Sequence, residues 1–263
     1  MRLRLLFLGD IVGRPGRRIL ASALPRWRER DGYDAVVANG ENAAGGFGLT
    51  PGTAAEIFDA GVDLITLGNH AFANREIVAL LESEPRVLRP ANYPAGAPGR
   101  GAGVFTVGGG RRLGILNLLG RVFMEPLDDP FAMAPRELAK LRAETPYVLV
   151  DFHAEATAEK IAFGWHVDGL ASAVVGTHTH VPTADGRILP GGTGYITDAG
   201  MCGPTEGVLG VDREIVVRKF LTQLPARFET AGGPAAMQGV RIELDERGKT
   251  VRIERVWSMD DGG

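Results

Sequence analysis

Short apolar segments alternate with segments of helical periodicity along most of the chain. Each apolar segment is four to six residues long and lacks a regular polar alternation. Segments of this kind are typical of parallel strands that are buried on both faces. The predicted strands are residues 3–8, 35–38, 62–67, 147–150 and 171–175.

Between these strands, apolar residues recur at the spacing of a helix that buries one face. Thr50 followed by Pro51, and also Asn74, are residue types that often begin a helix. The predicted helices are residues 17–28, a helix from 50–51 onward, and residues 74–81, 136–143, 157–167 and 212–224. Two hairpins are predicted, one joining residues 104–107 to 113–118 and one joining 240–244 to 251–256. The alternation predicts an α/β fold, or α+β in some classifications.

The length of the chain sets its domain organisation. With 263 residues it is long enough for one large core and short for two independent ones, so residues 1–263 are predicted to form a single domain. Residues 121–145 begin with a stretch rich in Pro, Asp and Met. This stretch predicts an excursion or small cap over the main sheet.

Composition and charge exclude several classes of protein. Hydrophobic residues make up 44% of the chain and charged residues 23%, which excludes a disordered protein. The 29 lysines and arginines are outnumbered by 32 aspartates and glutamates, and the net charge is −3. A partner that is a long nucleic acid is therefore not expected, because such binding depends on many phosphate contacts.

Hydropathy and cysteine content set the expected compartment. No apolar run approaches the ~20 residues of a membrane helix, and the apolar opening ends at Gly9-Asp10, too early for a signal peptide. We therefore expect a cytoplasmic protein without a membrane partner. Cys202 is the only cysteine, so neither an internal disulfide nor a thiolate metal site is available, and any metal must bind to nitrogen and oxygen ligands.

Polar residues whose side chains can bind metals or transfer protons follow each of the five predicted strands. They lie at residues 9–10, 39–42, 68–70, 151–153 and 176–180. Ligands in open α/β sheets bind beyond the carboxyl ends of the strands, so these five ends are expected to converge on one crevice.

Four of the five histidines lie at these strand ends. An isolated histidine in an apolar context is more often a core residue than a ligand, but the same strand ends also supply carboxylates and amides. The combined set is Asp10, Glu41, Asn42, Asn69, His70, His153, His178 and His180. The fifth, His166, lies in a predicted helix beside Trp165, where a packing or surface role is the better interpretation.

The donor types indicate which metals would bind. Imidazole, carboxylate and carboxamide together suit Mn, Fe or Zn, whereas Mg and Ca sites rarely contain several histidines. Seven or eight donors exceed the needs of one ion, and a carboxylate such as Glu41 can bridge two ions about 3.5–4 Å apart. Two transition metal ions per chain are therefore the expected cofactors.

Arg14 and Arg17 lie in a Gly- and Pro-rich turn before the first predicted helix. Free backbone N–H groups at a helix start, together with an arginine, can bind a phosphate. The turn lacks the Lys-Ser/Thr ending of a Walker loop, and an ordinary strand-to-helix turn is an equally good interpretation.

The ordered set of motifs resembles the calcineurin-like metallophosphoesterases, and longer stretches resemble their YmdB-type branch. The shared short motifs are Gly9-Asp10, Gly40-Glu41-Asn42, Gly68-Asn69-His70, His153 and residues 176–180. The longer stretches are residues 9–17, 89–94, 150–157 and 177–204. The resemblance spans nearly the whole chain. It implies an αββα four-layer sandwich, a dinuclear centre of iron or manganese, and phosphodiesterase activity on cyclic nucleotides, usually the 2′,3′-cyclic form.

The resemblance also implies roles for individual residues. Asp10, Glu41, Asn42 and His180 would hold the first metal ion, and Glu41, Asn69, His153 and His178 the second. His70 would be the general acid, and a hydroxide that bridges the metals would attack the phosphorus. Two departures from the pattern affect these roles: position 12 is Val rather than His, so Asn42 must supply an oxygen, and Ala73 replaces an Asp that would orient His70. Asn74 is the expected substitute.

Other functions remain open from the sequence. A phosphomonoesterase or phosphoprotein phosphatase would use the same ligands, and a low-turnover regulatory protein could keep the nucleotide site. Intact Asn69-His70 argues against pure binding, which needs no acid, and a structural protein with a vestigial site is least favoured because no ligand position is lost. A homo-oligomer is compatible with the sequence, which does not determine the oligomeric state.

Overall fold

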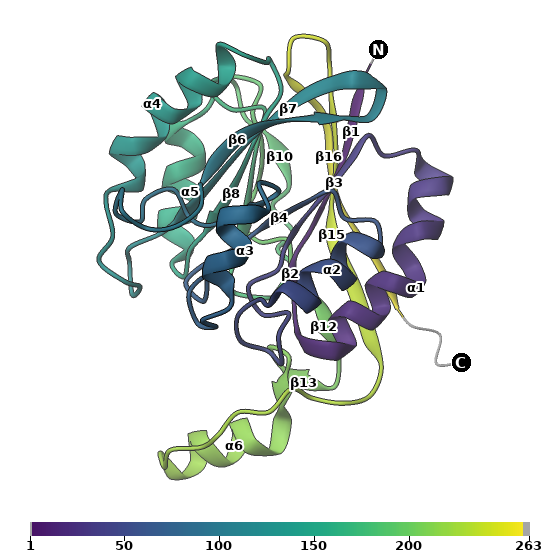
Figure 1. Cartoon of the computed structure of the whole chain (residues 1–263), viewed down its shortest axis with the longest axis vertical. Coiled ribbons are helices and arrows are strands. Elements are labelled where there is room, and N and C mark those ends of the chain that lie inside the picture. The colour runs from purple at the N-terminus through teal and green to yellow at the C-terminus, as the bar shows by residue number, and fades with distance from the viewer. Residues whose placement is uncertain (1, 260–263) are drawn as a thin grey trace.

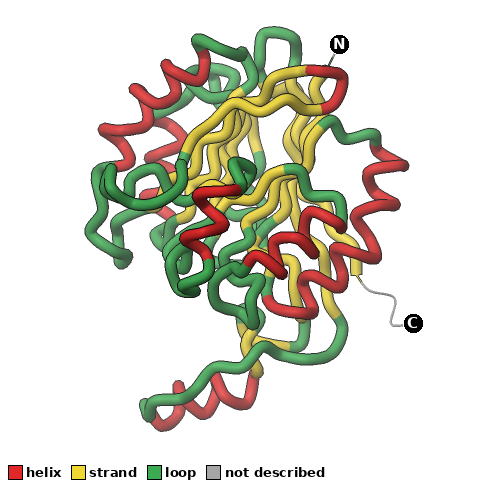
Figure 2. The backbone as a smooth tube through the Cα atoms, in the orientation of Figure 1, coloured by secondary structure: helices red, strands yellow, loops and turns green. Residues whose placement is uncertain are grey.

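The computed structural model describes residues 2–259 of the chain. Its strands form two main sheets, and the chain alternates between strands and helices as expected (Figure 1, Figure 2). The mixed α/β class predicted from the sequence is confirmed.

The larger sheet has eight strands. In chain order they are β1 (Leu3–Leu8), β2 (Asp10–Ile11), β3 (Ala35–Asn39), β4 (Leu64–Thr66), β5 (Val87–Leu88), β12 (Met201–Pro204), β15 (Ala235–Leu244) and β16 (Thr250–Met259). They are arranged in the order β2-β12-β15-β1-β3-β4-β5, and β16 pairs with β15. Strands β1, β3, β4 and β5 run parallel, so their carboxyl ends lie at one edge.

The second sheet has six strands in the order β10-β11-β9-β8-β7-β6. Its strands are β6 (Ala102–Val107), β7 (Arg111–Leu119), β8 (Val148–His153), β9 (Ala173–Thr177), β10 (Arg187–Ile188) and β11 (Gly194–Ile196). A short 3-10 turn, Gly108–Gly110, joins β6 to β7 in the predicted hairpin. Strands β7, β8, β9 and β11 are parallel.

The two sheets pack face to face. Successive side chains of a strand point to opposite faces of its sheet, so one face of β1 meets the other sheet and the opposite face meets the helices. In β1, Leu5 and Phe7 belong to an apolar cluster that joins both sheets, whereas Leu6 and Leu8 pack toward the helices. Helices α1 (Gly13–Asp31), α2 (Pro51–Asp59) and α3 (Ile77–Ser83) contribute to the cluster on the outer face of the larger sheet. Helices α4 (Pro130–Arg142) and α5 (Thr157–His166) contribute to the cluster on the outer face of the second sheet.

Some helix boundaries differ from the predicted ones. Helix α1 begins at Gly13 rather than at residue 17. Helix α4 begins at Pro130 rather than at residue 136, because Asp129 caps it. The Asp129 side chain accepts hydrogen bonds from the backbone N–H of Phe131 and from that of Ala132. Helix α3 begins at residue 77, so Asn74 does not cap it.

The region 121–145 contributes mainly to the body of the protein. Residues 121–129 are a loop, but α4 places Ala134, Leu138 and Leu141 in the core against the second sheet.

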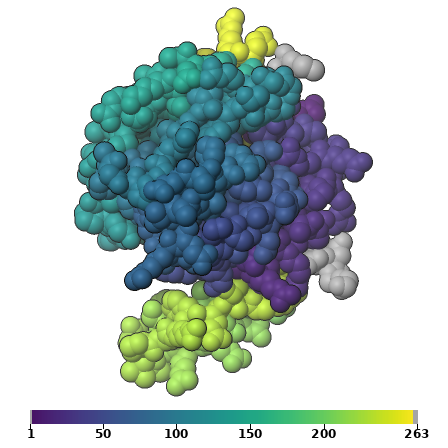
Figure 3. Space-filling view, in the orientation of Figure 1, coloured from purple at the N-terminus to yellow at the C-terminus, as the bar shows by residue number. Residues whose placement is uncertain are grey.

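The segment that projects from the body is residues 205–234, which we call the arm. It contains a two-stranded sheet of β13 (Gly207–Val208) and β14 (Val211–Asp212), followed by α6 (Arg213–Thr222). It appears as a separate lobe below the body in Figure 3. No helix within residues 2–259 is both long and apolar enough to cross a membrane.

Candidate metal centre

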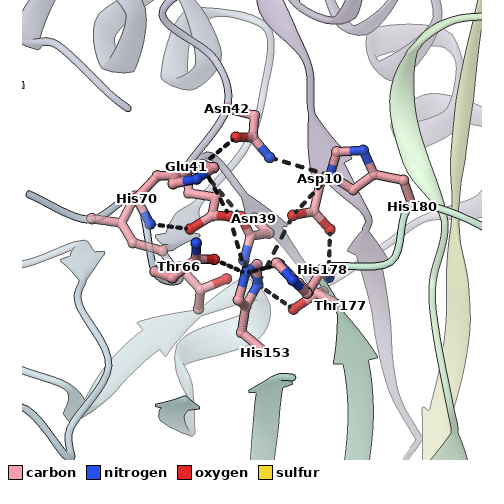
Figure 4. A network of polar contacts seen from close by, with 12 residues as sticks. Asp10, Asn39, Glu41, Asn42, Thr66, His70, His153, Thr177, His178 and His180 are labelled. Carbon is pink, nitrogen blue, oxygen red and sulfur yellow. Dashed lines mark hydrogen bonds and ion pairs between the residues drawn. The ribbon is translucent and has the colours of Figure 1, made fainter. Parts of the chain in front are cut away.

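The carboxyl ends of five parallel strands from both sheets meet at one place. Asp10 follows β1, Glu41 and Asn42 follow β3, and Asn69 follows β4. The second sheet supplies His153 at the end of β8, and His178 and His180 just beyond β9. Figure 4 shows the labelled side chains of this group, among them Asp10, Glu41 and His153, turned toward one another. The convergence predicted from the strand ends is therefore found.

Three side chains surround Nε2 of His153. This nitrogen lies 3.0 Å from Glu41 Oε1, 3.0 Å from His178 Nδ1 and 3.1 Å from Asn69 Oδ1. We call these three residues and His153 the inner donor set. Glu41, His153 and His178 form a group whose ligand atoms all lie within 4.8 Å of one another, as in a metal site.

In His153 and His178, the ring nitrogen that faces away from the centre contacts an oxygen atom. The hydroxyl of Thr177 donates to Asp151 Oδ1 (2.7 Å), so its oxygen accepts from Nδ1 of His153 (2.9 Å). Nε2 of His178 lies 2.9 Å from Glu155 Oε2. Each histidine therefore directs a lone pair to the centre, as metal-ligating histidines do. Two lone pairs facing each other at 3.0 Å repel unless a cation lies between them.

A second group lies beside the inner donor set, with Asp10 Oδ1 3.9 Å from Nδ1 of His153. Nε2 of His180 is 3.6 Å from Asp10 Oδ1 and 3.2 Å from Asn42 Nδ2. We call Asp10, Asn42 and His180 the outer donor set. Nδ1 of His180 donates to the carbonyl oxygen of Leu209 in the arm (3.0 Å), so this histidine also directs a lone pair to the centre.

Asp10 has an orphaned oxygen. The residue is fully buried, and Oδ1 has no hydrogen-bond partner among the described residues, whereas Oδ2 accepts from the backbone N–H of His178. A buried carboxylate oxygen without a partner is costly in a folded protein. A metal ion bound to Oδ1 would satisfy it, so the donor set fits the predicted cofactor.

The titratable groups of the centre influence one another. Burial alone would raise the pKa of Asp10, but the positive charges of His180 and His153 outweigh it and lower the pKa. Burial would lower the pKa of His153, but Glu41 outweighs it and raises that pKa to about 9. Burial lowers the pKa of His178 to about 3. In the absence of metal, the proton between the two inner histidines therefore belongs to His153.

His70 lies at the rim of the centre. Its backbone N–H donates to Glu41 Oε2 (2.9 Å), and its Nδ1 donates to Asn42 Oδ1 (2.9 Å). Burial lowers the pKa of the His70 imidazole. The expectation that Asn74 orients His70 is wrong, because Asn74 Oδ1 accepts from the backbone N–H of Glu76 instead.

Asn42 has two contacts that bear on its predicted role. Its oxygen faces His70 and its amide nitrogen faces His180. A ligand role through oxygen requires the amide to turn over, which presents Oδ1 to the outer donor set.

The two arginines predicted to contact a phosphate lie away from the centre. Arg17 Nε donates to Glu56 Oε2 (2.6 Å), and its guanidinium also donates to the carbonyl oxygen of Ala43. Arg14 is exposed on α1. Neither lines the cavity beside the centre. Arg17 therefore ties α1 to α2, as an ordinary structural residue does.

Several residues that support the ligands were not singled out from the sequence. Asp151 and Thr177 orient His153, Glu155 contacts His178, and Leu209 holds His180. Asp151 and Glu155 lie two residues from His153 along the chain, so the strand-end pattern was a usable signal for them. Leu209 acts through a backbone carbonyl, which no sequence pattern indicates.

His166 has the packing or surface role expected for it, since it is exposed on α5 and contacts Phe131. Its Nε2 contacts the carbonyl oxygen of Phe131 (2.9 Å), and its ring lies 5.4 Å from the ring of Phe131.

A cavity of about 480 Å³ opens beside the centre. One end carries Glu41, Asn42, His70, His178 and His180, and the other is formed by the loop after β3 and by the arm. Small-molecule sites have volumes of this order. No lysine or arginine of the described chain lines this cavity.

Known proteins resemble this chain over nearly its whole length. The family model described as YmdB-like protein matches residues 6–256. A Bacillus subtilis protein named 2′,3′-cyclic-nucleotide 2′-phosphodiesterase is 48% identical over 260 residues, which is 98% of each chain.

Two solved structures are also similar. A hypothetical protein from Thermus thermophilus has 46% identity and a TM-score of 0.90, with 98% of this chain and 100% of that chain covered. A protein from Mycoplasma pneumoniae described as a novel phosphatase has 34% identity and a TM-score of 0.93, with 99% and 95% covered. The chain thus belongs to the YmdB-like protein family, a family with relatives named as phosphodiesterase and phosphatase.

Proposed function

We propose that the chain is a dinuclear-metal phosphodiesterase that hydrolyses small cyclic nucleotides, with 2′,3′-cyclic nucleotides as the preferred class. The observation that carries the proposal is the pair of adjacent donor sets, one around His153 and one around Asp10 and His180 (Figure 4). The name of the Bacillus relative supports the choice of substrate.

Each donor set would hold one ion. The first ion would be held by Asp10, Asn42 and His180, and the second by Asn69, His153 and His178, with Glu41 shared between them. When bound, two such ions supply a nucleophile at neutral pH and stabilise charge on the phosphoryl oxygens. Iron and manganese suit this mixture of imidazole, carboxylate and carboxamide.

The residues of the chain perform the remaining tasks. When Asn42 turns over to bind the first ion through Oδ1, its amide nitrogen would donate to Nδ1 of His70, and the ring proton would lie on Nε2. Burial lowers the pKa of His70 and so favours this neutral ring, whose Nε2–H would donate to the departing sugar oxygen. Acid catalysis of this kind contributes ~10²–10⁴-fold to the rate.

The charge of the cavity favours a diester over a monoester. A cyclic phosphodiester carries one negative charge, whereas a phosphomonoester carries nearly two at neutral pH. The described lining contains Glu41 and Glu229 but no lysine or arginine, so only bound ions would balance the substrate. A relative from Mycoplasma pneumoniae is described as a phosphatase, so phosphomonoesterase activity is the second candidate function.

The arrangement of layers supports the same family of enzymes. Helices flank two sheets that pack face to face. We infer that this is the αββα sandwich of the calcineurin-like metallophosphoesterases, with the centre between the strand ends of the two sheets.

Hydrolysis of a substrate panel tests the proposal. Protein loaded with Mn²⁺ or Fe²⁺ is expected to convert 2′,3′-cyclic AMP to a monophosphate, and to do so faster than it hydrolyses 3′,5′-cyclic AMP or p-nitrophenyl phosphate. Chromatography of the product would establish whether the 2′ oxygen leaves, which gives the 3′-monophosphate. A preference for the monoester would instead support the phosphatase.

A further inference from the structure

The cavity beside the metal centre has an aromatic end. Phe47 and Phe228 line it, although 57% and 48% of their surfaces remain exposed. Phe47 lies in the loop after β3, and Phe228 lies in the arm after α6. Both rings therefore offer apolar surface to a planar group of a ligand that is bound at the metal centre.

Phe47 is placed next to the candidate acid. Its ring centroid is 4.1 Å from that of His70, with the planes tilted by 43°. Gly46 and Gly48 have φ angles of 91° and 82°, which glycine adopts readily, so Phe47 lies in a tight turn between them. The aromatic surface therefore begins where the leaving oxygen would receive its proton.

The geometry of a cyclic nucleotide matches this arrangement. In a 2′,3′-cyclic nucleotide the base is attached to C1′, the carbon next to the one that bears the 2′ oxygen. A substrate that places the 2′ oxygen near His70 therefore places its base near Phe47. Phe228 has the Lys219 ammonium 4.6 Å from its ring centroid, so a planar group can stack on the opposite face of that ring.

We propose that Phe47 and Phe228 form a nucleobase subsite and that the arm thereby contributes to substrate recognition. This inference rests on the proposed function. Stacking tolerates any base, because every base has a π-face, so the subsite would select nucleotides over other cyclic phosphates without selecting one base strongly.

The test compares two substrates that differ in the base. One is 2′,3′-cyclic AMP, and the other is glycerol 1,2-cyclic phosphate, which has the same five-membered ring and no base. Phe228→Ala is expected to lower kcat/KM for the nucleotide by about 5- to 150-fold, mainly through KM, and to leave kcat/KM for the glycerol ester within about threefold. Phe228→Tyr keeps the ring and is expected to retain activity. Phe220→Ala, an exposed phenylalanine elsewhere in the arm, is the matched control.

The outcomes separate the two proposals. If the wild-type protein hydrolyses neither cyclic ester, the proposed function fails. If it hydrolyses both esters with equal kcat/KM, or if Phe228→Ala weakens both equally, the proposed function stands and the nucleobase subsite is contradicted.

A different observation concerns the turn that carries His178 and His180. Both histidines have positive φ angles, 94° and 62°, which is a strained conformation for residues other than glycine. Thr179 lies between them. Its backbone N–H and hydroxyl both donate to Asp198 Oδ2, at 3.1 and 2.6 Å.

Asp198 is in turn paired with a buried lysine. Lys160 Nζ on α5 donates to Asp198 Oδ2 (2.8 Å) and to Thr179 Oγ1 (3.2 Å), and both charged side chains are almost completely buried. A buried ion pair of this kind is seldom retained for stability alone, because removing two charges from water is costly.

We infer that Lys160 and Asp198 are positioning residues that hold this turn so that one histidine reaches each donor set. Lys160→Met and Thr179→Val are expected to weaken Mn²⁺ binding by about 10- to 100-fold in calorimetric titration. The double variant Lys160→Met/Asp198→Asn removes both buried charges and tests the same turn if a single variant folds poorly. Arg28→Met, which breaks a partly exposed ion pair with Asp63, is the control.

The readout distinguishes positioning from simple stabilisation. If these residues only stabilise the fold, their variants lower the melting temperature and leave the number and affinity of bound Mn²⁺ ions unchanged. That result would overturn the inference.

Discussion

The two donor sets of the centre differ in how completely the protein forms them. In the inner set, Glu41, Asn69 and His178 all lie 3.0–3.1 Å from Nε2 of His153. In the outer set, Asp10 and His180 are 3.6 Å apart, and the Asn42 oxygen faces His70. The donors of the inner set thus contact one another directly, whereas the outer set has a carboxylate oxygen without a hydrogen-bond partner among the described residues.

This difference follows from what supports each set. His153 lies at the end of a central strand and is oriented through Thr177 by Asp151, all of them buried. His180 depends on the carbonyl oxygen of Leu209, which belongs to the projecting arm. The inner set is therefore expected to bind its ion more tightly than the outer set.

The largest effect is expected from Glu41, which we propose as the shared ligand of both ions. Glu41→Gln keeps the size of the side chain but removes its charge, so both ions should be lost or bound weakly and turnover should fall by at least ~10³-fold. Elemental analysis and turnover measure this. Glu56→Gln, at an exposed glutamate on α2, is the control and should retain both ions.

His70 is expected to separate chemistry from metal binding. His70→Gln removes the acid but no ligand, so both ions should remain while kcat falls by ~10²–10⁴-fold with KM little changed. Steady-state kinetics with parallel metal analysis measure this. Normal turnover in this variant would remove His70 from the mechanism.

Thr177→Val is expected to affect the inner set alone. The change keeps the shape of the side chain but removes the hydroxyl that links His153 to Asp151. Affinity for the inner ion should fall by ~10–100-fold, and affinity for the outer ion should not change. Calorimetric titration with Mn²⁺ resolves the two ions, and an equal loss at both would contradict the separate support of the two sets.

The smallest effect is expected in the number of protons that are released when the inner ion binds. The pKa of His153 is raised to about 9 without metal, so this histidine is protonated at neutral pH and an ion must displace the proton. Affinity for the inner ion should therefore rise about tenfold per pH unit as pH increases toward 9 and then level off. The pKa of His178 is lowered to about 3, so it should release no proton. Titration in buffers of different ionisation enthalpy measures the number of protons released.

The sequence allowed the site to be predicted better than its surroundings. The strand ends could be recognised because buried apolar segments stop abruptly at Gly9-Asp10 or Gly68-Asn69-His70. Strand ends of parallel sheets meet at one edge, so the grouping followed without coordinates. The pairing of two sheets was implied by the family resemblance and not by periodicity, because a strand buried on both faces looks the same whether a helix or a sheet covers it.

Other features depended on contacts between distant residues. The partner of His70 is Asn42 and not the nearby Asn74, since the loop after β3 comes closer to His70 than its own neighbour does. Arg17 is used in an ion pair with Glu56, a residue 39 positions away. The arm was predicted only as a helix, and its contact with His180 uses a carbonyl oxygen that any residue would supply.

Counting metal ions in three proteins tests the central claim most directly. Wild-type protein saturated with Mn²⁺ is expected to bind two ions per chain and to give the electron paramagnetic resonance spectrum of an exchange-coupled pair. Asp10→Asn and His153→Gln should each bind one ion, with the spectrum of isolated Mn²⁺, because each change disables a different donor set. A wild-type protein that binds only one ion per chain while fully active would contradict the dinuclear centre.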